Sequence, residues 1–377
     1  MIYVQHLLGI GHVQRAILLA SALTQQGFRV DLVTGGMPLA MTALPGIDIH
    51  QLPSTYSPDA SFSRLLDANG NEVDDAWRNS RRAQLLDLFE RLSPQVLITE
   101  TFPFGRRMMR FELIPLLEGA RDSAHCLQVI SSIRDILQPK SKPGRNREIC
   151  ELVDQYYDHV LVHGDPSVAV LEDSFESAAK IRDKIYYSGY ICKADATVTD
   201  RSQVGGEVLV SAGGSDTGLR ILETAIAARS LTRLQHVDWR ILVSPAIDAA
   251  AFRRLQQRAD KGMTVERNRE DFAALMQQAS LSISQAGYNT VTDILGARVP
   301  AVVIPFAEAD EIEQTLRARR LQAYGRLVML EADQLSAEKL AAAVDRAFEL
   351  DTSLTVNLDG AANSAAKIEA WLQAAQA

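Results

Sequence analysis

The sequence predicts an α/β protein made of two domains, each built on a parallel β-sheet. Short apolar runs alternate with longer helical patterns along the chain, which is typical of βαβ units. The chain has 377 residues, more than one compact core usually supports. A polar, turn-rich stretch at 191–206 interrupts the alternating pattern, which then starts again.

The first half is expected to contain seven strands separated by helices. We place the strands at 2–7, 28–34, 47–52, 95–99, 126–131, 159–164 and 184–189. The first helix is predicted from about His12 to Gln26 and ends before Gly27, a residue typical of helix ends. Its apolar stripe against the sheet is expected to contain Val13, Ile17, Leu18 and Ala22.

The second half repeats this organisation. We place its strands at 207–212, 239–244, 263–267, 281–284, 301–306 and 326–330. The predicted domains are therefore 1–190 and 207–358, with 191–206 as the linker. Residues 359–377 form a helix that we expect to pack back on the first domain, because Ile368, Trp371 and Leu372 need to be covered. Ligands of such sheets bind at the carboxyl ends of the strands, and two facing domains form a cleft there.

Composition excludes several classes of protein. The formal net charge of -8 argues against a nucleic-acid partner, which requires a broad basic face. The three cysteines are widely spaced and show neither a disulfide framework nor a zinc motif, so we expect no metal and a cytoplasmic protein. No run reaches the ~18 apolar residues of a membrane span, which leaves only peripheral membrane contact open; the oligomeric state is not predicted.

The segment HLLGIGHVQR (6–15) follows the first predicted strand. Its Gly9-x-Gly11-x-x-Gln14 spacing lacks the third glycine of the dinucleotide fingerprint, so bound NAD is not expected. Gly11 still lets a ligand approach the backbone closely. His12 falls in the first turn of a helix, where the positive helix end keeps the imidazole neutral and able to take a proton from a hydroxyl. His12 is the first candidate for a general base; the alternative is a capping or cleft-lining residue.

Two carboxylates are further candidates in the first domain. Glu100 ends one predicted strand and Asp135 lies soon after another, so both are expected at loops facing the cleft. Either could act as the base or orient His12 or the acceptor.

The second domain contains two turns suited to a nucleotide diphosphate. Gly213, Gly214 and Ser215 follow a strand and precede a helix, an arrangement that binds phosphate through backbone N–H groups. A second such turn runs from Ser284 through Gly287, Tyr288, Asn289 and Thr290. Asp293, about one helical turn later, can accept hydrogen bonds from ribose hydroxyls.

Two other segments are expected to contact sugars. The stretch 307–314, which ends in Glu313 and Gln314, follows a strand and could hold the hydroxyls of a donor sugar; the alternative is a solvated acidic helix face. In the first domain, the loops 53–77 and 102–110 are candidates for the acceptor site. The second loop combines Phe102 and Phe104 with Arg106 and Arg107, which suits sugars or an anionic acceptor.

These segments together resemble the two-domain GT-B glycosyltransferases, and within them the MurG-like family 28. The resemblance is carried by the G-x-G-H loop, the GGS turn, and the stretch from Ser284 to Asp293 followed by Pro305-Phe306 and Glu313-Gln314. It implies a hexosyltransferase with two Rossmann-like domains that uses a UDP-sugar, inverts the anomeric carbon and needs no metal. It also implies that Ser215, Gly287, Tyr288 and Asn289 hold the diphosphate, that Asp293 binds ribose, and that Glu313 and Gln314 touch the donor sugar.

The sequence departs from that family and also resembles a second group. Asp293 and Glu313 stand where a glutamate and a glutamine are usual, so the resemblance does not identify the sugar. UDP-sugar hydrolases of the pseudaminic acid pathway also show G-x-G-H-x-x-R and GGSD, matched here by Arg15 and Asp216. The donor region is closer to transferases, so we expect transfer; hydrolysis with His12 activating water is the alternative. A UDP-sugar 2-epimerase and a non-catalytic binding module are further options.

Overall fold

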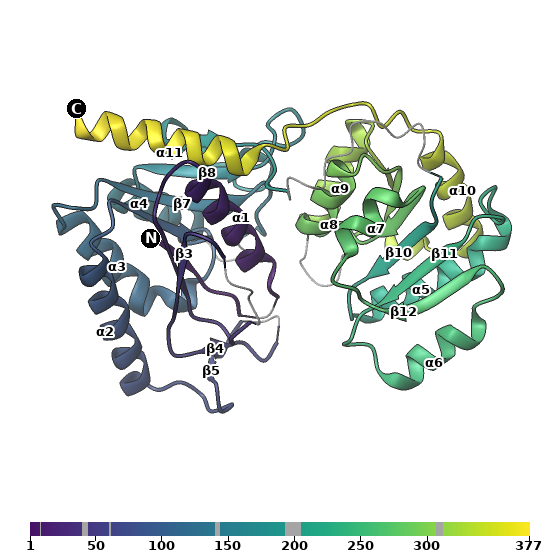
Figure 1. Ribbon diagram of the computed structural model, residues 1–377, viewed down its shortest axis with the longest axis horizontal. Coiled ribbons are helices and arrows are strands. Elements are labelled where there is room, and N and C mark those ends of the chain that lie inside the picture. The colour runs from purple at the N-terminus through teal and green to yellow at the C-terminus, as the bar shows by residue number, and fades with distance from the viewer. Residues whose placement is uncertain (8, 40–43, 60–61, 140–143, 193–204, 307–311) are drawn as a thin grey trace. The chain divides into compact units, whose positions relative to one another are not determined.

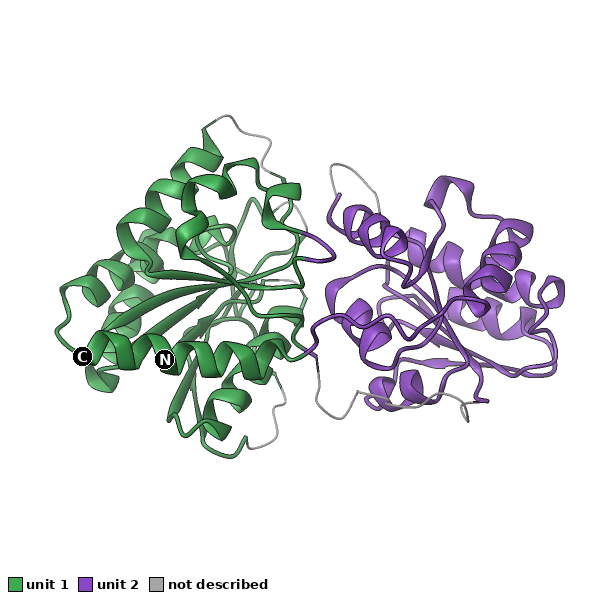
Figure 2. Cartoon of the chain, turned by 90° about the horizontal axis from the view of Figure 1, so that it is seen from above, with its two compact units in different colours: residues 1–166, 170–191, 359–377 green, residues 167–169, 192–358 purple. Residues whose placement is uncertain are grey.

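The computed structural model forms two units, each a parallel sheet with helices on its faces (Figures 1 and 2). It describes residues 1–7, 9–39, 44–59, 62–139, 144–192, 205–306 and 312–377. Unit 1 comprises 1–166, 170–191 and 359–377, and unit 2 comprises 167–169 and 192–358. The predicted fold class is confirmed. The predicted linker lies outside the described residues at 193–204.

Unit 1 contains a seven-stranded parallel sheet in the order β3-β2-β1-β6-β7-β8-β9. Its strands are β1 (Ile2–Val4), β2 (Val30–Thr34), β3 (Ile47–Gln51), β6 (Val96–Glu100), β7 (Gln128–Arg134), β8 (His159–His163) and β9 (Ile185–Tyr187). The helices are α1 (Gly11–Gln25), α2 (Asp75–Leu92), α3 (Arg110–Asp122), α4 (Arg145–Tyr156) and α11 (Gly360–Gln376).

Alternate side chains of β1 enter the two cores of unit 1. Tyr3 belongs to the core under α2, α3 and α4, whereas Ile2 and Val4 belong to the core under α1 and α11. This alternation follows from the pleat of a strand, which turns successive side chains to opposite faces. Both faces of the sheet are therefore buried, which explains the continuous apolar runs of its strands.

Helix α1 buries a different stripe from the expected one. Val13 is buried as predicted, but the other fully buried apolar positions are Ala16, Leu19, Ala20 and Leu23. Ile17, Leu18 and Ala22 are only partly buried against the same core. The reason is that α1 packs on two partners, the sheet and α11, so its apolar surface is wider than one stripe.

Helix α11, at the end of the chain, packs on unit 1. Ala365 and Ile368 are buried in the core beneath α1. Trp371 stacks on the ring of His159 with 3.6 Å between ring centroids. Asn363 donates through Nδ2 to the Ser188 carbonyl at 2.9 Å. In Figure 1 this helix is the yellow ribbon beside α1 and β8.

Unit 2 contains a six-stranded parallel sheet in the order β12-β11-β10-β13-β14-β15. Its strands are β10 (Val208–Ala212), β11 (Trp239–Val243), β12 (Met263–Arg267), β13 (Leu281–Ser284), β14 (Ala301–Val303) and β15 (Val328–Met329). The helices are α5 (Asp216–Ala228), α6 (Ala249–Arg258), α7 (Phe272–Gln278), α8 (Tyr288–Gly296), α9 (Glu313–Ala323) and α10 (Ala337–Phe348).

The strand order reverses once in each unit. Along the chain, strands are added on one side of β1 and then, from β6, on its other side; β10 and β13 have the same relation in unit 2. At such a reversal the connections that follow the two central strands diverge to opposite faces of the sheet, which leaves a crevice at their carboxyl ends.

Two features of unit 1 differ from the sequence prediction. β7 runs to Arg134 rather than ending at 131, because Ser131 and Ser132 are buried in the sheet with their hydroxyls hydrogen-bonded. A short antiparallel hairpin, β4 (Thr55–Tyr56) with β5 (Leu66–Asp67), was not predicted. Part of the predicted acceptor loop, 60–61, lies outside the described residues.

Candidate functional site

His12 lies in the crevice of unit 1 where the strand order reverses. Helix α1 begins at Gly11, and its N-cap residue Ile10 makes no side-chain capping bond. The side chain of His12 is 17% exposed and lines a pocket of about 740 Å³. The predicted position in the first turn is therefore observed.

The nearest partner of the imidazole is Glu100, the last residue of β6. His12 Nδ1 lies 3.0 Å from Glu100 Oε1 and 3.1 Å from the hydroxyl of Thr101. An ionised carboxylate can only accept, so Nδ1 carries the proton and donates it to Glu100. The other ring nitrogen, Nε2, then holds a lone pair and can take a proton from a substrate hydroxyl.

Burial lowers the pKa of His12 to about 3, while the hydrogen bond to Glu100 opposes this and the charges of Arg106 and Arg15 add to it. The ring is thus neutral mainly because it is buried, and not because of the helix end on which the sequence prediction relied. Burial also disfavours a charged Glu100, but the charge of Arg15 and the hydrogen bond from His12 outweigh it and hold the pKa of Glu100 below its usual range.

Arg15 and Ser132 complete the surroundings of Glu100. Arg15, 3% exposed, forms an ion pair with Glu100 Oε1 from the next turn of α1. Ser132 on β7 donates to Glu100 Oε2 at 2.7 Å. Both carboxylate oxygens are therefore hydrogen-bonded, and the carboxylate is fixed on β6.

Asp135, the other acid singled out from the sequence, does not face this pocket. It is 1% exposed, and a Cβ placed on Gly164 would lie 2.6 Å from the Asp135 Cβ, so the two backbones are in close contact. The pocket is lined instead by its neighbours Ile133, Arg134 and Leu137. The structure therefore brings Glu100, and not Asp135, to the imidazole.

The pocket beside His12 combines apolar walls with positive charge. The apolar lining includes Leu7, Phe104, Met108, Ile133, Leu137 and Ile149. The charged lining residues that the structure describes are Arg106, Arg107, Arg110, Arg134, Arg145 and Glu148. Arg107 and Arg110 both pair with Glu148. A pocket of this size holds a drug-sized ligand.

Arg106 is the charged residue most closely tied to the base. It adopts a left-handed backbone conformation (φ 56°), as does Thr101 (φ 70°), at the two ends of a short loop after β6. Its Nε donates to the Gln5 carbonyl at 2.7 Å, and its guanidinium lies 5.9 Å from the centre of the Phe62 ring. Burial lowers the pKa of Arg106 to about 10, so this cation is poorly hydrated and suited to an anion.

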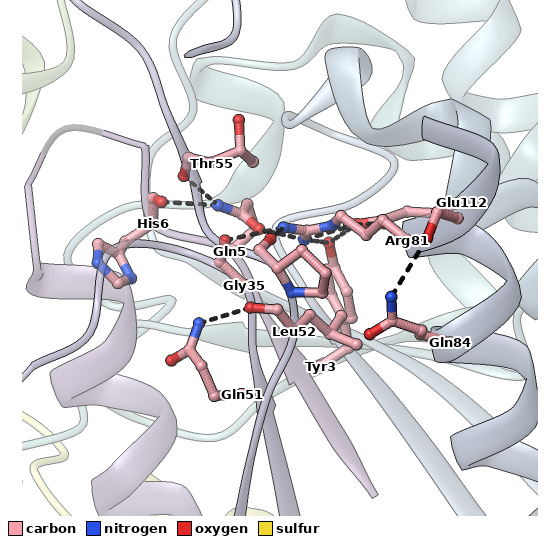
Figure 3. Close-up of polar contacts among 12 residues, drawn as sticks. Tyr3, Gln5, His6, Gly35, Gln51, Leu52, Thr55, Arg81, Gln84 and Glu112 are labelled. Carbon is pink, nitrogen blue, oxygen red and sulfur yellow. Dashed lines mark hydrogen bonds and ion pairs between the residues drawn. The ribbon is translucent and has the colours of Figure 1, made fainter. Parts of the chain in front are cut away.

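A buried ion pair supports the loops on that side of the crevice (Figure 3). Arg81 of α2 and Glu112 of α3 are fully buried and joined by two contacts of 2.7 and 2.9 Å. Arg81 also donates to the Gln5 side chain at 2.7 Å and to the Gly35 carbonyl at 2.9 Å. Since a Cβ on Gly35 would lie 2.0 Å from the guanidinium, only glycine fits there.

In unit 2, the turn after β10 is built as the sequence suggested. Ser215 caps α5 by accepting from the Gly218 amide at 3.2 Å. The Gly213 amide donates to Gln285 Oε1 at 2.9 Å, so a phosphate at this amide must displace that side chain. A Cβ on Gly214 would lie 2.4 Å from the Ala246 Cβ, which explains the second glycine by packing.

The turn after β13 leads into α8. Gly287 is the N-cap residue of α8, and it has no side chain that could accept a hydrogen bond from the first amides of the helix. Tyr288 is 5% exposed, and its ring faces the Arg317 guanidinium at 5.6 Å. It can therefore offer its backbone rather than its ring to a ligand. Asn289, Thr290 and Asp293 follow within α8.

Glu313 and Gln314 have structural partners. Glu313 is 4% exposed and pairs at 2.8 Å with Arg317, which is fully buried. The side-chain oxygen of Gln314 accepts from the amides of Ala286 and Phe306, each at 3.1 Å. Gln314 thus joins the loops after β13 and β14. The preceding residues of the predicted sugar-binding stretch, 307–311, lie outside the described residues.

A second pocket, of about 300 Å³, lies at the reversal of strand order in unit 2. It is lined by Gly213, Ser284 and Thr290, which the sequence singled out, and by Ser211, Ala212, Asn268, Arg269, Phe272 and Gln285, which it did not. Asn268 and Arg269 follow directly after β12, whose bounds the sequence predicted. The same rule that selected the other loops could have found them.

The described residues contain no cluster of three or more histidine, cysteine or acidic side chains arranged to hold a metal ion. Among the described helices, none is both long and apolar enough to cross a membrane.

Known proteins are similar to part of the chain. Residues 208–370 match the glycosyltransferase family 28 C-terminal domain. Over 140 residues the chain is 34% identical to the UDP-N-acetylglucosamine--N-acetylmuramyl-(pentapeptide) pyrophosphoryl-undecaprenol N-acetylglucosamine transferase of Alkalilimnicola ehrlichii, covering 35% of this chain and 37% of that protein. An uncharacterised glycosyltransferase of Methanopyrus kandleri is 27% identical over 165 residues, which cover 43% of this chain and 44% of that protein. The matches thus span less than half of these relatives' own length.

Solved structures are similar over the whole chain. Acinetobacter baumannii MurG has a TM-score of 0.58 and 16% identity, covering 100% of this chain and 98% of that one. The glycotransferase of kitacinnamycin has a TM-score of 0.63 and 15% identity, covering 99% and 95%. At these identities the likeness shows the fold, which is GT-B.

Proposed function

We propose that this GT-B chain, which carries a glycosyltransferase family 28 C-terminal domain, transfers a sugar from a nucleotide diphosphate sugar to a hydroxyl group of an acceptor. The observation that carries the proposal is the His12–Glu100 pair beside a pocket of about 740 Å³. The pair can remove a proton, and the pocket has room for the molecule that loses it.

His12 is the base in this mechanism. Its Nε2 takes the proton of the acceptor hydroxyl while the oxygen attacks the anomeric carbon in line with the departing diphosphate, which inverts that carbon. Glu100 is a positioning residue: it accepts from Nδ1 at 3.0 Å and stabilises the imidazolium as it forms. The negative charge of the leaving group is balanced by helix N-termini.

The donor is assigned to unit 2. Backbone groups of Gly213, Gly214 and the Gly287–Thr290 turn hold the diphosphate, with the Ser215 hydroxyl beside them. Asp293 accepts from ribose hydroxyls. Glu313 and Gln314 contact the donor sugar, the latter through its amide nitrogen because its oxygen already joins two loops. We take uridine as the base, since the relatives that match use UDP-N-acetylglucosamine.

The acceptor is assigned to the pocket of unit 1, and we propose that it carries an anionic group on an apolar body. Apolar side chains form most of one wall, and Arg106 is a desolvated cation near His12. Arg107 and Arg110 are instead neutralised by Glu148. The acceptors named for the relatives contain pyrophosphoryl-undecaprenol, which has both an anionic and an apolar part.

Hydrolysis of the donor uses the same base with water as acceptor. It needs no pocket beyond the space for one water, so the volume beside His12 favours transfer. The two reactions differ in their products and in their dependence on an acceptor.

A product assay tests the proposal. The chain is incubated with UDP-, GDP- and dTDP-sugars, with and without hydroxyl-bearing acceptors, and nucleotides and sugars are separated by chromatography. We expect UDP and a glycosylated product only when an acceptor is present. Free sugar or sugar phosphate in the absence of acceptor would establish hydrolysis, and binding of UDP-sugar without turnover would establish a binding module.

Paired variants test the charge of the acceptor. Arg106→Gln should raise KM for a carboxylate- or phosphate-bearing acceptor about 10- to 100-fold, the value of one charged hydrogen bond, and leave KM for the donor unchanged. Arg107→Gln is the matched control, because this arginine is 56% exposed and pairs with Glu148. An equal change in the two variants, or no preference for the anionic member of a matched pair of acceptors, would contradict the assignment.

A further inference from the structure

A buried chain of hydrogen bonds continues beyond Glu100, away from the pocket. Ser132 donates to Glu100 Oε2 at 2.7 Å, and its oxygen also lies 2.9 Å from Nε2 of His163. His163 ends β8 and is fully buried; its Nδ1 lies 2.9 Å from the hydroxyl of Ser188. None of these three side chains lines the pocket, so none of them can touch a substrate there.

The donors along this chain point one way. The single hydroxyl proton of Ser132 goes to the carboxylate, so its oxygen accepts from His163 Nε2. Burial lowers the pKa of His163 to about 3, so the ring is neutral and carries one proton. With that proton on Nε2, Nδ1 can only accept, and the Ser188 hydroxyl lies closer to it (2.9 Å) than to its other acceptor, the Gly189 carbonyl (3.2 Å). Each group therefore donates toward Glu100.

The direction matters because three groups donate to the other oxygen of Glu100, Oε1: His12, Arg15 and the hydroxyl of Thr101, the last at 3.1 Å. His12 and Arg15 both reach Oε1, and their nitrogens lie 3.2 Å apart. A guanidinium prefers to bind both oxygens of a carboxylate. The hydrogen bond from Ser132 to Oε2 opposes the rotation of the carboxylate that such binding by Arg15 would require, so Oε1 stays turned toward His12.

We propose that His163 is a positioning residue of the proton-accepting site: by fixing the Ser132 hydroxyl on Oε2 of Glu100, it keeps Oε1 facing His12 and so keeps the proton of His12 on Nδ1. The inference rests on the proposed function for its catalytic consequence. It is independent of that function in its structural part, the tautomer of His12.

The far end of the chain is fixed by α11. Asn363 donates to the Ser188 carbonyl at 2.9 Å. A Cβ on Gly360 would lie 2.2 Å from the Gly189 carbonyl oxygen, so helix and strand end are in contact at this glycine. The residues that hold Ser188 therefore come from the last helix of the chain, and the network joins β6, β7, β8 and α11.

The first test is kinetic. His163→Phe keeps an aromatic ring but removes both ring nitrogens, and Ser132→Ala removes the intermediate hydroxyl. Each should lower kcat about tenfold, the lower end of the loss seen when a hydrogen-bonded partner behind a functional histidine is removed, with KM for the donor within about twofold. Ser132→Thr, which keeps a hydroxyl, should restore kcat.

A double-mutant cycle separates positioning from general stability. In a Glu100→Gln background, His163→Phe should cause no further loss of kcat, because the residue acts through Glu100. Tyr157→Phe is the matched control: it removes a buried 2.8 Å hydrogen bond to Thr99, the neighbour of Glu100 on β6. It should lower thermal stability and leave kcat unchanged. An equal loss from His163→Phe in both backgrounds would overturn the proposal.

The second test does not depend on turnover. In ¹⁵N-histidine NMR spectra, with His12 assigned by His12→Gln, the wild-type signal should show protonated Nδ1 and unprotonated Nε2. His163→Phe and Ser132→Ala should each shift it toward a mixture of tautomers, and Tyr157→Phe should not. An unchanged His12 signal in both variants would refute the inference. Absence of transfer by the wild type would refute the proposed function and leave this result standing.

Discussion

The two units have similar strand orders, but the crevice at the reversal of strand order contains different kinds of residue in each unit. In unit 1 the crevice between β1 and β6 contains a buried histidine paired with a carboxylate. In unit 2 the corresponding crevice between β10 and β13 contains glycine turns and two helix N-termini. Six of the seven histidines in the sequence fall in unit 1. The topology thus supplies a place for a ligand, and the residues after the two central strands decide what is done there.

The largest expected effect separates chemistry from binding. His12→Ala should lower kcat about 10²–10⁴-fold, the usual contribution of a general base, and leave UDP affinity nearly unchanged, because the donor is assigned to unit 2. Initial rates and calorimetric titration with UDP measure the two quantities. If the variant instead loses UDP binding, His12 has a structural role, and the assignment of the base to unit 1 and of donor binding to unit 2 is wrong.

Measurements of stability distinguish the buried Arg81–Glu112 ion pair of unit 1 from an exposed ion pair in the same unit. Arg81→Met leaves the buried Glu112 without its cationic partner, with only the Tyr3 hydroxyl among the described residues still donating to it, and should destabilise unit 1 by about 3–5 kcal/mol, as measured by urea unfolding. Arg81→Met combined with Glu112→Leu should recover most of that loss. Arg91→Met is the control, since the Arg91–Asp87 pair is more than 60% exposed, and should cost less than about 1 kcal/mol. A double variant no more stable than Arg81→Met would contradict this account.

Acid should affect unit 1 through its buried histidines. Burial lowers the pKa of His12 and of His163 from 6.5 to about 3, so between these values these two residues bind up to two more protons in the unfolded chain than in the native one. Stability is therefore full above pH 6.5 and falls as the pH decreases toward 3. The lowered pKa of Glu100 acts in the same direction below pH 4.5.

Urea unfolding at several pH values measures this dependence, and His163→Phe should reduce the slope by about one proton. Because the same lowered pKa keeps His12 neutral, kcat/KM should show no inflection near pH 6.5 from this residue. An inflection there that His12→Gln removes would show that the imidazole is more hydrated than its contacts indicate.

The smallest expected effect tests the proposed anion site of unit 2. Gly287→Ala places a methyl group where nothing lies within 4 Å, at a backbone conformation (φ -63°) that alanine adopts. Folding should be unaffected, but a diphosphate at the start of α8 would meet the methyl group. Loss of one hydrogen bond to a charged group should weaken UDP binding about 10- to 100-fold.

Gly119→Ala on α3 is the control, because its Cβ also meets nothing within 4 Å and it lies in unit 1. Without ligand, Gly287→Ala should keep the wild-type melting temperature, and Gly119→Ala, which places alanine inside a helix, should keep or raise it. If UDP stabilises Gly287→Ala as much as the wild type, the diphosphate does not lie at α8.

The sequence predicted the sheets well because parallel strands buried on both faces are continuous apolar runs. It failed at β7, where Ser131 and Ser132 read as a strand end but are buried and hydrogen-bonded in the sheet. In the sequence, a serine in a sheet cannot be distinguished from a serine in a turn unless the hydrogen-bond partner of its hydroxyl is known.

The sequence identified the two residues of the candidate site in unit 1, but it did not establish that they contact each other. His12 was singled out by its place in the first turn of a helix and Glu100 by its place at a strand end. Their contact depends on β1 lying beside β6, and a local sequence pattern does not reveal the order of strands in a sheet. The same limitation made Asp135 look equivalent to Glu100. Arg81 was not found at all, because a charge on a polar helix face gives no sign that it is buried.

The packing of helix α11 on unit 1 affects the order in which the two units can fold during synthesis. Unit 1 needs residues 359–377 to cover α1 and to hold Ser188, and these are translated after all of unit 2. A nascent chain therefore finishes its first unit last, with the partly apolar outer surface of α1 exposed to chaperones while unit 2 leaves the ribosome. Proteins truncated before Gly360 would carry all of unit 2 except its connection to α11, and an unfinished unit 1.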